Sequence, residues 1–328
     1  MSQSDILLEI KDLHVKYTTE RSVCYALNGL NLIIHRGESM GLVGETGAGK
    51  TTTALSILNL LPVGVGEIIK GEILFNGTAI SQMSQRDLRN LRGNRIAMIF
   101  QNPLTSLNPV FTIGEQISMV IRKHQKCSAT EANKQTRLLL EKVNIPGARL
   151  KDYPNQFSGG MRQRVGIAAG IAMNPELLIA DEPTTALDVT IQAQILELMR
   201  ALKTQYDTSL LMITHNLGII SELCETVSVI YGGRIIESGS VSSVFGNPLH
   251  YYTEGLLGAI PSLDDKRERL TAIPGRIASA TNLPSGCAFH PRCPHATDRC
   301  RNEVPQMVSV GEKHFVACFD RRDYWFGK

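Results

Sequence analysis

The sequence has no long hydrophobic run, few aromatic residues and almost balanced charge. No segment approaches the roughly 18 consecutive apolar residues of a membrane-spanning helix, so none is predicted. The first residues, Met1 to Ile6, lack a basic stretch followed by an apolar one, so no signal peptide is expected. Lys and Arg number 34 against 31 Asp and Glu, which argues against a dedicated nucleic-acid binder. We therefore expect a cytoplasmic chain that reaches a membrane only through a partner.

The pattern of apolar segments predicts an α/β fold. Hydrophobic residues make up 43% of the 328 residues, enough for a substantial core. Short apolar strands separated by helical segments indicate a mostly parallel sheet with helices on both faces. Beyond Pro261 the composition shifts to Pro, Gly, Arg and Cys with little periodicity. We therefore predict one large domain over residues 1–260 and a small extension over residues 261–328.

A glycine-rich loop between a strand and a helix is the strongest motif. It matches G-x-x-x-x-G-K-[ST] in full and consists of Gly44, Glu45, Thr46, Gly47, Ala48, Gly49, Lys50 and Thr51, with Thr52 next. Its glycines let successive backbone N–H groups wrap phosphate oxygens, and the following helix adds its positive N-terminal end. Lys50 would reach the β- and γ-phosphates, and the Thr51 hydroxyl would ligate Mg²⁺. The loop predicts a bound nucleotide such as ATP.

A pair of carboxylates follows a fully apolar strand. Leu177–Ala180 is this strand, and Asp181 and Glu182 come directly after it. Ligands of open α/β sheets lie at this end of the strands. Asp181 would hold Mg²⁺, and Glu182 would act as general base on the attacking water. Together with the loop, the pair predicts nucleotide hydrolysis.

A third motif identifies a family resemblance. The segment Phe157-Ser-Gly-Gly-Met-Arg-Gln-Arg164 resembles the signature of ATP-binding cassette (ABC) ATPases, with Phe157 and Met161 in place of the usual Leu and Gln. The resemblance implies a P-loop NTPase cassette with a RecA-like core, an antiparallel β subdomain and a helical subdomain at about residues 102–173. It also implies that Ser158, Gly159 and Gly160 contact the γ-phosphate of a nucleotide held by a partner cassette.

Smaller elements of the same family are present. Gln101 follows the predicted strand Arg95–Phe100 and resembles the Q-loop glutamine, which senses Mg²⁺ and water. Ala186-Leu-Asp188 resembles the D-loop at the dimer interface, and His215 the switch histidine at the γ-phosphate. Tyr17 stands where the family has an aromatic residue that stacks on adenine, with Tyr25 as a competitor.

Longer segments resemble the dipeptide and oligopeptide importer subfamily. They are Phe100–Pro109, Asp181–Gln194, His250–Leu257 and the closing Gly286–Pro294. This resemblance implies an ATPase subunit that drives uptake of di- or oligopeptides, or in some relatives of nickel or metal chelates. The implied partners are a second ATPase subunit, two integral membrane permeases and an extracytoplasmic substrate-binding protein, with the chain at the cytoplasmic face of the membrane and no nucleic acid.

Four of the seven cysteines lie in the extension. Cys287, Cys293, Cys300 and Cys318 have the spacing C-x5-C-x6-C-x17-C, wider than that of most zinc sites. Four thiolates can bind Zn²⁺ or a [4Fe–4S] cluster, with His290 and His295 as further possible ligands. Because some members of the subfamily carry a cluster at matching cysteines, we expect a structural [4Fe–4S] cluster in residues 285–320, with zinc and free thiols as the alternatives.

Two other functional classes compete with transport. A non-transport ABC ATPase of DNA repair or translation typically has two cassettes in one chain or a long coiled-coil insertion, and this sequence has neither. A regulatory module with a degenerate ATPase conflicts with the intact Lys50, Asp181, Glu182 and His215. Co-purification with integral membrane permeases would separate these classes.

Overall fold

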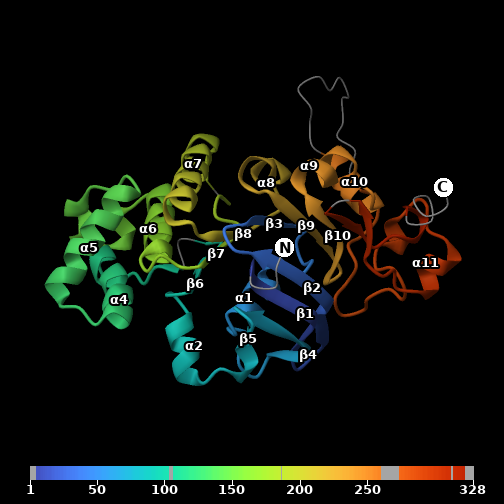
Figure 1. Cartoon of the computed structure of the whole chain (residues 1–328), viewed down its shortest axis with the longest axis horizontal. Coiled ribbons are helices and arrows are strands. Elements are labelled where there is room, and N and C mark those ends of the chain that lie inside the picture. Colours follow the sequence, from blue (N-terminus) through green and yellow to red (C-terminus); the bar gives the residue numbers. More distant parts are fainter. Residues whose placement is uncertain (1–4, 103–105, 186, 260–272, 312, 322–328) are drawn as a thin grey trace. The chain divides into compact units, whose positions relative to one another are not determined.

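A computed structural model describes residues 5–102, 106–185, 187–259, 273–311 and 313–321 of the chain (Figure 1). The chain divides into two compact units, each built from segments that are distant in the sequence. Unit 1 comprises residues 1–7, 35–39 and 82–213, and unit 2 comprises residues 8–34, 40–81 and 214–328. The predicted boundary residue, Pro261, lies outside the described residues.

Three parallel strands lie in unit 1. β6 (Ile96–Ile99) pairs with β7 (Leu177–Asp181), and β7 pairs with β8 (Ser209–Thr214), both in parallel. Every residue of β7 and β8 is buried. An interior parallel strand has both faces covered, which explains why Leu177–Ala180 and Leu210–Ile213 are continuous apolar runs rather than alternating ones.

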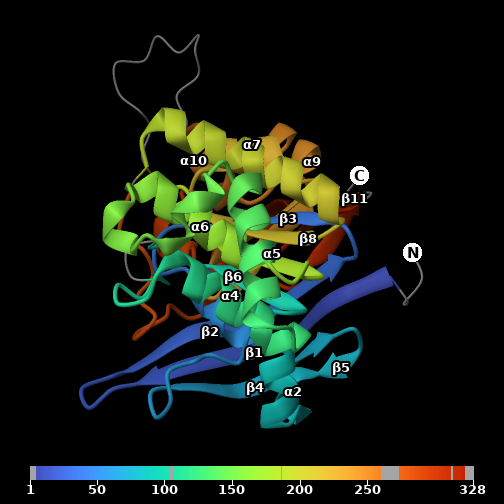
Figure 2. The ribbon, with the colours of Figure 1, turned by 90° about the vertical axis from the view of Figure 1, so that its left-hand side faces the viewer.

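The helices of unit 1 include those of the predicted helical region. α4 (Ile113–Gln125), α5 (Ala129–Lys142) and α6 (Gly159–Ile171) lie side by side, as two views at right angles show (Figures 1 and 2). α4 begins with a capping box, in which the Thr112 side chain accepts from the Glu115 N–H and the Glu115 side chain accepts from the Thr112 N–H. Two further helices, α2 (Gln85–Leu91) and α7 (Val189–Tyr206), complete the unit.

Unit 2 contains an antiparallel sheet of four strands. Their order is β2 (Val23–His35), β1 (Ile6–Thr18), β4 (Gly66–Phe75) and β5 (Thr78–Ala79). β1 and β4 pair antiparallel, with Leu8 opposite Phe75. Both of these residues are buried, so the register places their side chains in the core.

Five further strands of unit 2 include two from the end of the chain. β3 (Ser39–Val43) pairs in parallel with β9 (Thr226–Tyr231), which forms an antiparallel hairpin with β10 (Arg234–Ser240). Beyond β10 come β12 (His314–Val316) and β11 (Val308–Gly311), both antiparallel. β11 and β12 were not predicted from the sequence, because their short, half-exposed segments carry no periodic signal.

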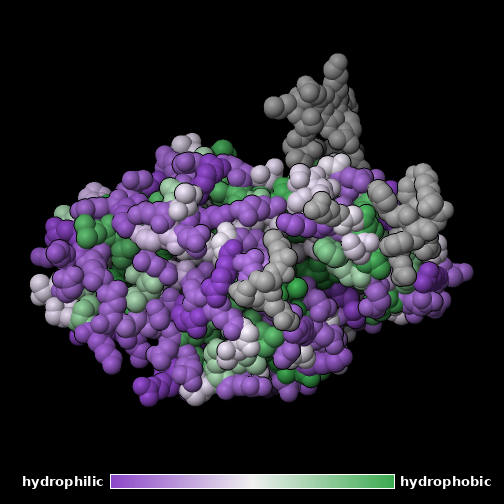
Figure 3. Space-filling model, viewed as in Figure 1, coloured by the Kyte–Doolittle hydropathy of each residue, from purple (hydrophilic) through white to green (hydrophobic). Residues whose placement is uncertain are grey.

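The helices of unit 2 are short. They are α1 (Lys50–Ile57), α8 (Leu217–Leu223), α9 (Val241–Gly246), α10 (Tyr251–Gly258) and α11 (Asp298–Asn302). In the part of the chain that the structure describes, no helix has the length and apolarity needed to cross a bilayer. The surface over α4 and α5 is mostly hydrophilic in the view of Figure 3.

Candidate nucleotide-binding site

The glycine-rich loop of unit 2 connects β3 to α1. Gly47 and Gly49 have φ of 84° and 110°, a left-handed conformation that side chains rarely adopt. A Cβ at Gly44 would stand 2.4 Å from the carbonyl oxygen of Ile230, and one at Gly49 would stand 2.8 Å from that of Ala26. The backbone therefore lies where only glycine fits, which is the property that a close phosphate cradle requires.

Lys50 begins α1 and its ammonium group lies within the loop. Its Nζ donates to the carbonyl oxygens of Gly44 at 2.7 Å and Glu45 at 3.1 Å, and the residue is 6% exposed. A buried ammonium group at the start of a helix gives this loop two sources of positive potential, the cation and the helix end. The loop geometry thus suits the polyphosphate of a nucleotide.

Tyr17 lies beside the start of α1. Its hydroxyl donates to the Thr52 hydroxyl at 3.2 Å, which places the tyrosine of β1 next to the residues that follow the loop. The competitor Tyr25 is 44% exposed, and its backbone N–H donates to the Ala280 carbonyl at 2.8 Å. Of the two tyrosines, Tyr17 is therefore the one with a contact to the loop segment.

Glu182 occupies a constrained position at the end of β7 in unit 1. Its φ is 46°, rare for a residue with a side chain, and its N–H donates to the Ile213 carbonyl at 2.8 Å. One carboxylate oxygen accepts from Gln101 Nε2 at 2.8 Å and from the Thr185 hydroxyl at 3.0 Å. The structure thus brings the side chains of Gln101 and Glu182 together. The contact of Thr185 was not predicted.

The donor set predicted for Mg²⁺ suits that ion. Thr51 is exposed at the start of α1, whereas Asp181 is 2% exposed at the end of β7. A hydroxyl, a carboxylate and the amide oxygen of Gln101 are hard oxygen donors, the ligand type that Mg²⁺ prefers. His215 follows β8 and is exposed, directly before the Asn216 cap of α8.

The signature segment forms the N-terminus of α6. Ser158 caps this helix by accepting from the Met161 N–H at 3.4 Å. Phe157 is buried, and the guanidinium of Arg149 lies 4.1 Å from the centre of its ring, so the phenyl group takes the place of an apolar Leu while gaining a cation–π contact. The departures from the family pattern therefore leave the capped helix start intact.

The D-loop residue Asp188 lies next to the signature within unit 1. Asp188 caps α7 and accepts from the Ile191 N–H at 2.9 Å. The side chain of Ile191 fills the space beside Gly160, where a Cβ would stand 2.5 Å from Ile191 Cγ2. Only glycine at position 160 permits this approach. Ala186 of the predicted D-loop lies outside the described residues.

The predicted [4Fe–4S] cluster is wrong, and so is the zinc alternative. All four tail cysteines line one small cavity with Phe289 and Phe319, yet no group of three or more His, Cys, Asp or Glu among the described residues could hold a metal ion. Burial raises the pKa of Cys287 to about 11 and also raises those of Cys293 and Cys318. The structure shows all seven cysteines as free.

Contacts other than a metal hold the tail segment in place. The Cys287 N–H donates to the Cys300 carbonyl at 2.8 Å, and the rings of Tyr251 and His295 stack with centroids 4.2 Å apart. β12 pairs with β10, where His314 Nε2 lies 2.8 Å from a carboxylate oxygen of Glu237. These packing and hydrogen-bonding contacts do the stabilising that the sequence assigned to a cluster.

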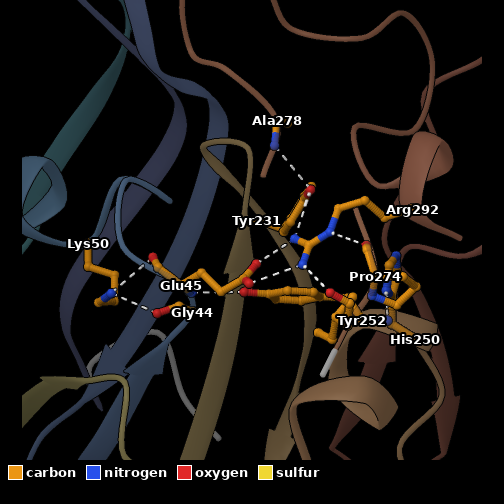
Figure 4. Close-up of polar contacts among 10 residues, drawn as sticks. Gly44, Glu45, Lys50, Tyr231, His250, Tyr252, Pro274, Ala278 and Arg292 are labelled. Atoms are coloured by element: carbon orange, nitrogen blue, oxygen red, sulfur yellow. Dashed lines mark hydrogen bonds and ion pairs between the residues drawn. The ribbon is translucent and has the colours of Figure 1, made fainter. Parts of the chain in front are cut away.

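The structure also adds residues that sequence reasoning missed beside the loop. Arg292 of the tail contacts the Glu45 carboxylate at 2.6 and 3.1 Å, and the Tyr252 hydroxyl accepts from the Glu45 N–H at 2.8 Å (Figure 4). The segments are separated by up to 247 residues, and no spacing rule links them. The only signal was an arginine inside the family-like segment Gly286–Pro294.

Two protein-family models match parts of the chain. The family model described as ABC transporter matches residues 27–185, and that described as oligopeptide/dipeptide transporter, C-terminal region, matches residues 236–300. A dimeric structure of the ATP-binding cassette MJ0796 bound to ADP and Pi is similar with a TM-score of 0.64 at 26% identity, over 71% of this chain and 98% of that one. The fold is that of an ATP-binding cassette.

Relatives match over nearly the whole length. The oligopeptide transport ATP-binding protein OppD of Bacillus subtilis is 47% identical over 94% of this chain and 87% of the relative. OppD of Salmonella typhimurium is 44% identical over 96% of this chain and 94% of the relative. A probable peptide ABC transporter ATP-binding protein of Sinorhizobium fredii is 46% identical over 97% of this chain and 96% of the relative. The chain belongs to the ABC transporter family.

Proposed function

We propose that this chain is the ATP-hydrolysing subunit of an importer of di- or oligopeptides. The match of residues 236–300 to the C-terminal region of oligopeptide and dipeptide transporters carries this proposal, because the cassette by itself occurs with many cargoes. The names of the relatives at 44–47% identity support it. Import of nickel or metal chelates by the same mechanism is the alternative that the subfamily resemblance leaves open.

In the proposed mechanism the loop residues bind ATP. The backbone N–H groups between Thr46 and Thr51 hold the phosphates, Lys50 moves its ammonium from the loop carbonyls to the β- and γ-phosphates, and Tyr17 stacks on adenine. Thr51, Gln101 and Asp181 would hold Mg²⁺, which when bound neutralises charge on the phosphate oxygens.

The residues of unit 1 and His215 carry the hydrolysis step. Glu182 accepts a proton from the attacking water, and Gln101 keeps its carboxylate oriented through the 2.8 Å contact. His215 positions the γ-phosphate, and Ser158, Gly159, Gly160 and Asp188 act on the nucleotide of a partner cassette. ATP binding and hydrolysis would then switch two integral membrane permeases between outward-facing and inward-facing access. An extracytoplasmic binding protein would deliver the substrate, and this chain would lie on the cytoplasmic face.

The domain roles are part of the proposal. Residues 1–260 would form the nucleotide-binding domain, with the helical subdomain at about residues 102–173 directed at the permeases. Residues 261–328 would form the C-terminal extension that distinguishes peptide importers from other cassettes.

Reconstitution tests this proposal. Co-expression with two candidate permeases and a second ATPase subunit, followed by detergent extraction, should yield one complex that contains this chain. In liposomes this complex should show ATPase activity that rises with a peptide-loaded binding protein, and a Lys50→Ala complex should not. Stimulation by nickel chelates but not by peptides would favour the alternative cargo, and an isolated chain that co-purifies with no permease would contradict the transport role.

A further inference from the structure

Glu45, the second residue of the phosphate-binding loop, is held from three directions (Figure 4). Its N–H donates to the Tyr252 hydroxyl at 2.8 Å, and its carbonyl oxygen accepts from Lys50 Nζ at 3.1 Å. Its two carboxylate oxygens accept from Arg292 Nη1 at 2.6 Å and Nη2 at 3.1 Å. Because the N–H is bonded to Tyr252, Glu45 serves the loop as an anchor point rather than as a phosphate donor.

The Arg292 side chain is buried and held by several hydrogen bonds. Its side chain is only 3% exposed, and Nε donates to the Pro274 carbonyl at 3.1 Å. Nη1 also contacts the Tyr231 hydroxyl at 3.4 Å, and Nη2 the Ile273 carbonyl at 3.3 Å. The five N–H groups of a guanidinium therefore match five contacts, a planar pattern that lysine cannot reproduce.

The aromatic neighbours fix the same arrangement. The rings of Tyr231 and Tyr252 lie edge to face with centroids 4.6 Å apart, and that of Phe289 lies 5.3 Å from Tyr231. Tyr231 and Tyr252 are almost completely buried, so their hydroxyl groups have few alternative orientations. The tail, β9 and α10 thus meet at one loop residue.

Loss of the Arg292–Glu45 contact would displace the backbone of the glycine-rich loop. A Cβ at Gly44 would stand 2.4 Å from the Ile230 carbonyl oxygen, so the loop backbone passes close to β9, and Lys50 Nζ donates to the carbonyl oxygens of both Gly44 and Glu45. Loss of the guanidinium leaves the Glu45 carboxylate, 24% exposed, without its cationic partner, and the carboxylate would turn towards water and carry the first peptide units of the loop with it. A shift of about 1 Å in such a site costs as much as a hundredfold in activity.

We propose that Arg292 is a positioning residue for the nucleotide, and that through Glu45 the C-terminal segment 273–311 sets the affinity of the glycine-rich loop for ATP phosphates. The inference rests on the proposed ATPase function and extends it to the segment that distinguishes this subfamily. It also gives that segment a role at the loop without any metal.

The test is a double-mutant cycle on the full-length chain. The variants are Arg292→Gln, Glu45→Gln and the double variant, with Arg292→Lys as the conservative replacement. Arg301→Gln is the matched control, because Arg301 is an exposed arginine of the same segment whose partner Asp298 is also exposed. The readouts are the Kd of MgATP by equilibrium dialysis, the KM and kcat of the ATPase, and the thermal midpoint, all at a temperature where each variant is folded.

We expect Arg292→Gln and Glu45→Gln each to raise the Kd and KM for MgATP about tenfold, within the usual range for coupled sites, and the double variant to add no more than twofold. Arg292→Lys should lie between wild type and Arg292→Gln, and Arg301→Gln should match wild type. A lower thermal midpoint with unchanged Kd and KM would overturn the proposal, because Arg292 would then be purely structural. Additive effects of the two single variants would also overturn it, since Arg292 would not act through Glu45.

Two further results keep the test decisive. Where Arg292→Gln does not fold, Tyr252→Phe removes only the acceptor of the Glu45 N–H, and it should raise the Kd for MgATP severalfold; an unchanged Kd would count against the anchor. Failure of the wild-type chain to bind MgATP would contradict the proposed function itself, whereas normal wild-type binding with indifferent variants contradicts only the role of Arg292.

Discussion

His250, which caps α10, should make the stability of the protein fall in mildly acidic solution. The residue is 2% exposed, and its Nδ1 accepts from the Tyr252 N–H at 3.1 Å, which requires an unprotonated nitrogen. Burial lowers its pKa from the ordinary value to about 4, against an opposing attraction from Glu237. Unfolding exposes the imidazole, which then titrates near its ordinary value of about 6.5.

The sign and size follow from the two pKa values. Between pH 6.5 and 4 the unfolded chain binds the additional proton, so stability is fully present above about pH 6.5 and is lost as the pH falls towards 4. The lost free energy of unfolding is about 2 kcal/mol at pH 5 and about 3 kcal/mol at pH 4. A loss of this size is a large fraction of the stability of an ordinary domain.

Urea unfolding, followed by circular dichroism at pH 7.5, 6 and 5, measures this effect. The comparison is with His250→Asn, which keeps a side-chain acceptor at the cap but does not titrate. The surface carboxylates are common to both proteins, so their contribution cancels in the difference. Wild type should lose about 2 kcal/mol more than the variant between pH 7.5 and 5. Equal losses in both would refute the assignment of a neutral, buried His250.

Two predictions concern the nucleotide-binding loop. Gly44→Ala places a Cβ 2.4 Å from the Ile230 carbonyl oxygen, so the loop must shift and the Kd for MgATP in equilibrium dialysis should rise at least tenfold; Gly166→Ala, where a Cβ meets open space, is the control and should bind normally. Tyr17→Ala should weaken MgATP binding by about 1–3 kcal/mol through lost stacking, measured by the same dialysis. Tyr25→Ala should leave binding unchanged, and the reverse order would assign the adenine contact to Tyr25.

The elements that could be predicted from the sequence are those with a strong local pattern. β7 is a fully apolar run and was predicted within one residue, and Ser158 caps α6 as its chemistry favours. By contrast, the first residues of β4 (Gly66–Phe75) are mostly exposed, so this part of the strand gives no buried apolar run. Local chemistry therefore located the interior strands better than the exposed parts of a sheet.

The candidate site divides in the same way. Motif spacing predicted roles for Lys50 and Glu182, and these roles stay predictions; the structure adds the hydrogen bonds that surround the two residues. The contact of Arg292 with Glu45 depends on the tertiary fold, since it joins residues 247 positions apart. The four tail cysteines and the family resemblance predicted a metal centre, whereas no group of three or more His, Cys, Asp or Glu in the described part of the chain could hold a metal ion. A local sequence pattern does not show which distant residues pair or how burial arranges their side chains in the folded chain.

The proposed role of Glu182, as the general base of ATP hydrolysis in a peptide importer, is tested by its replacement with Gln. Glu182→Gln keeps an acceptor of similar shape for Gln101 and Thr185 but removes the basic carboxylate. In the transporter assembled with its permeases, the variant should bind MgATP with wild-type Kd while its ATPase rate and peptide uptake fall at least about a hundredfold. Near-normal hydrolysis and uptake by the assembled variant would contradict the account.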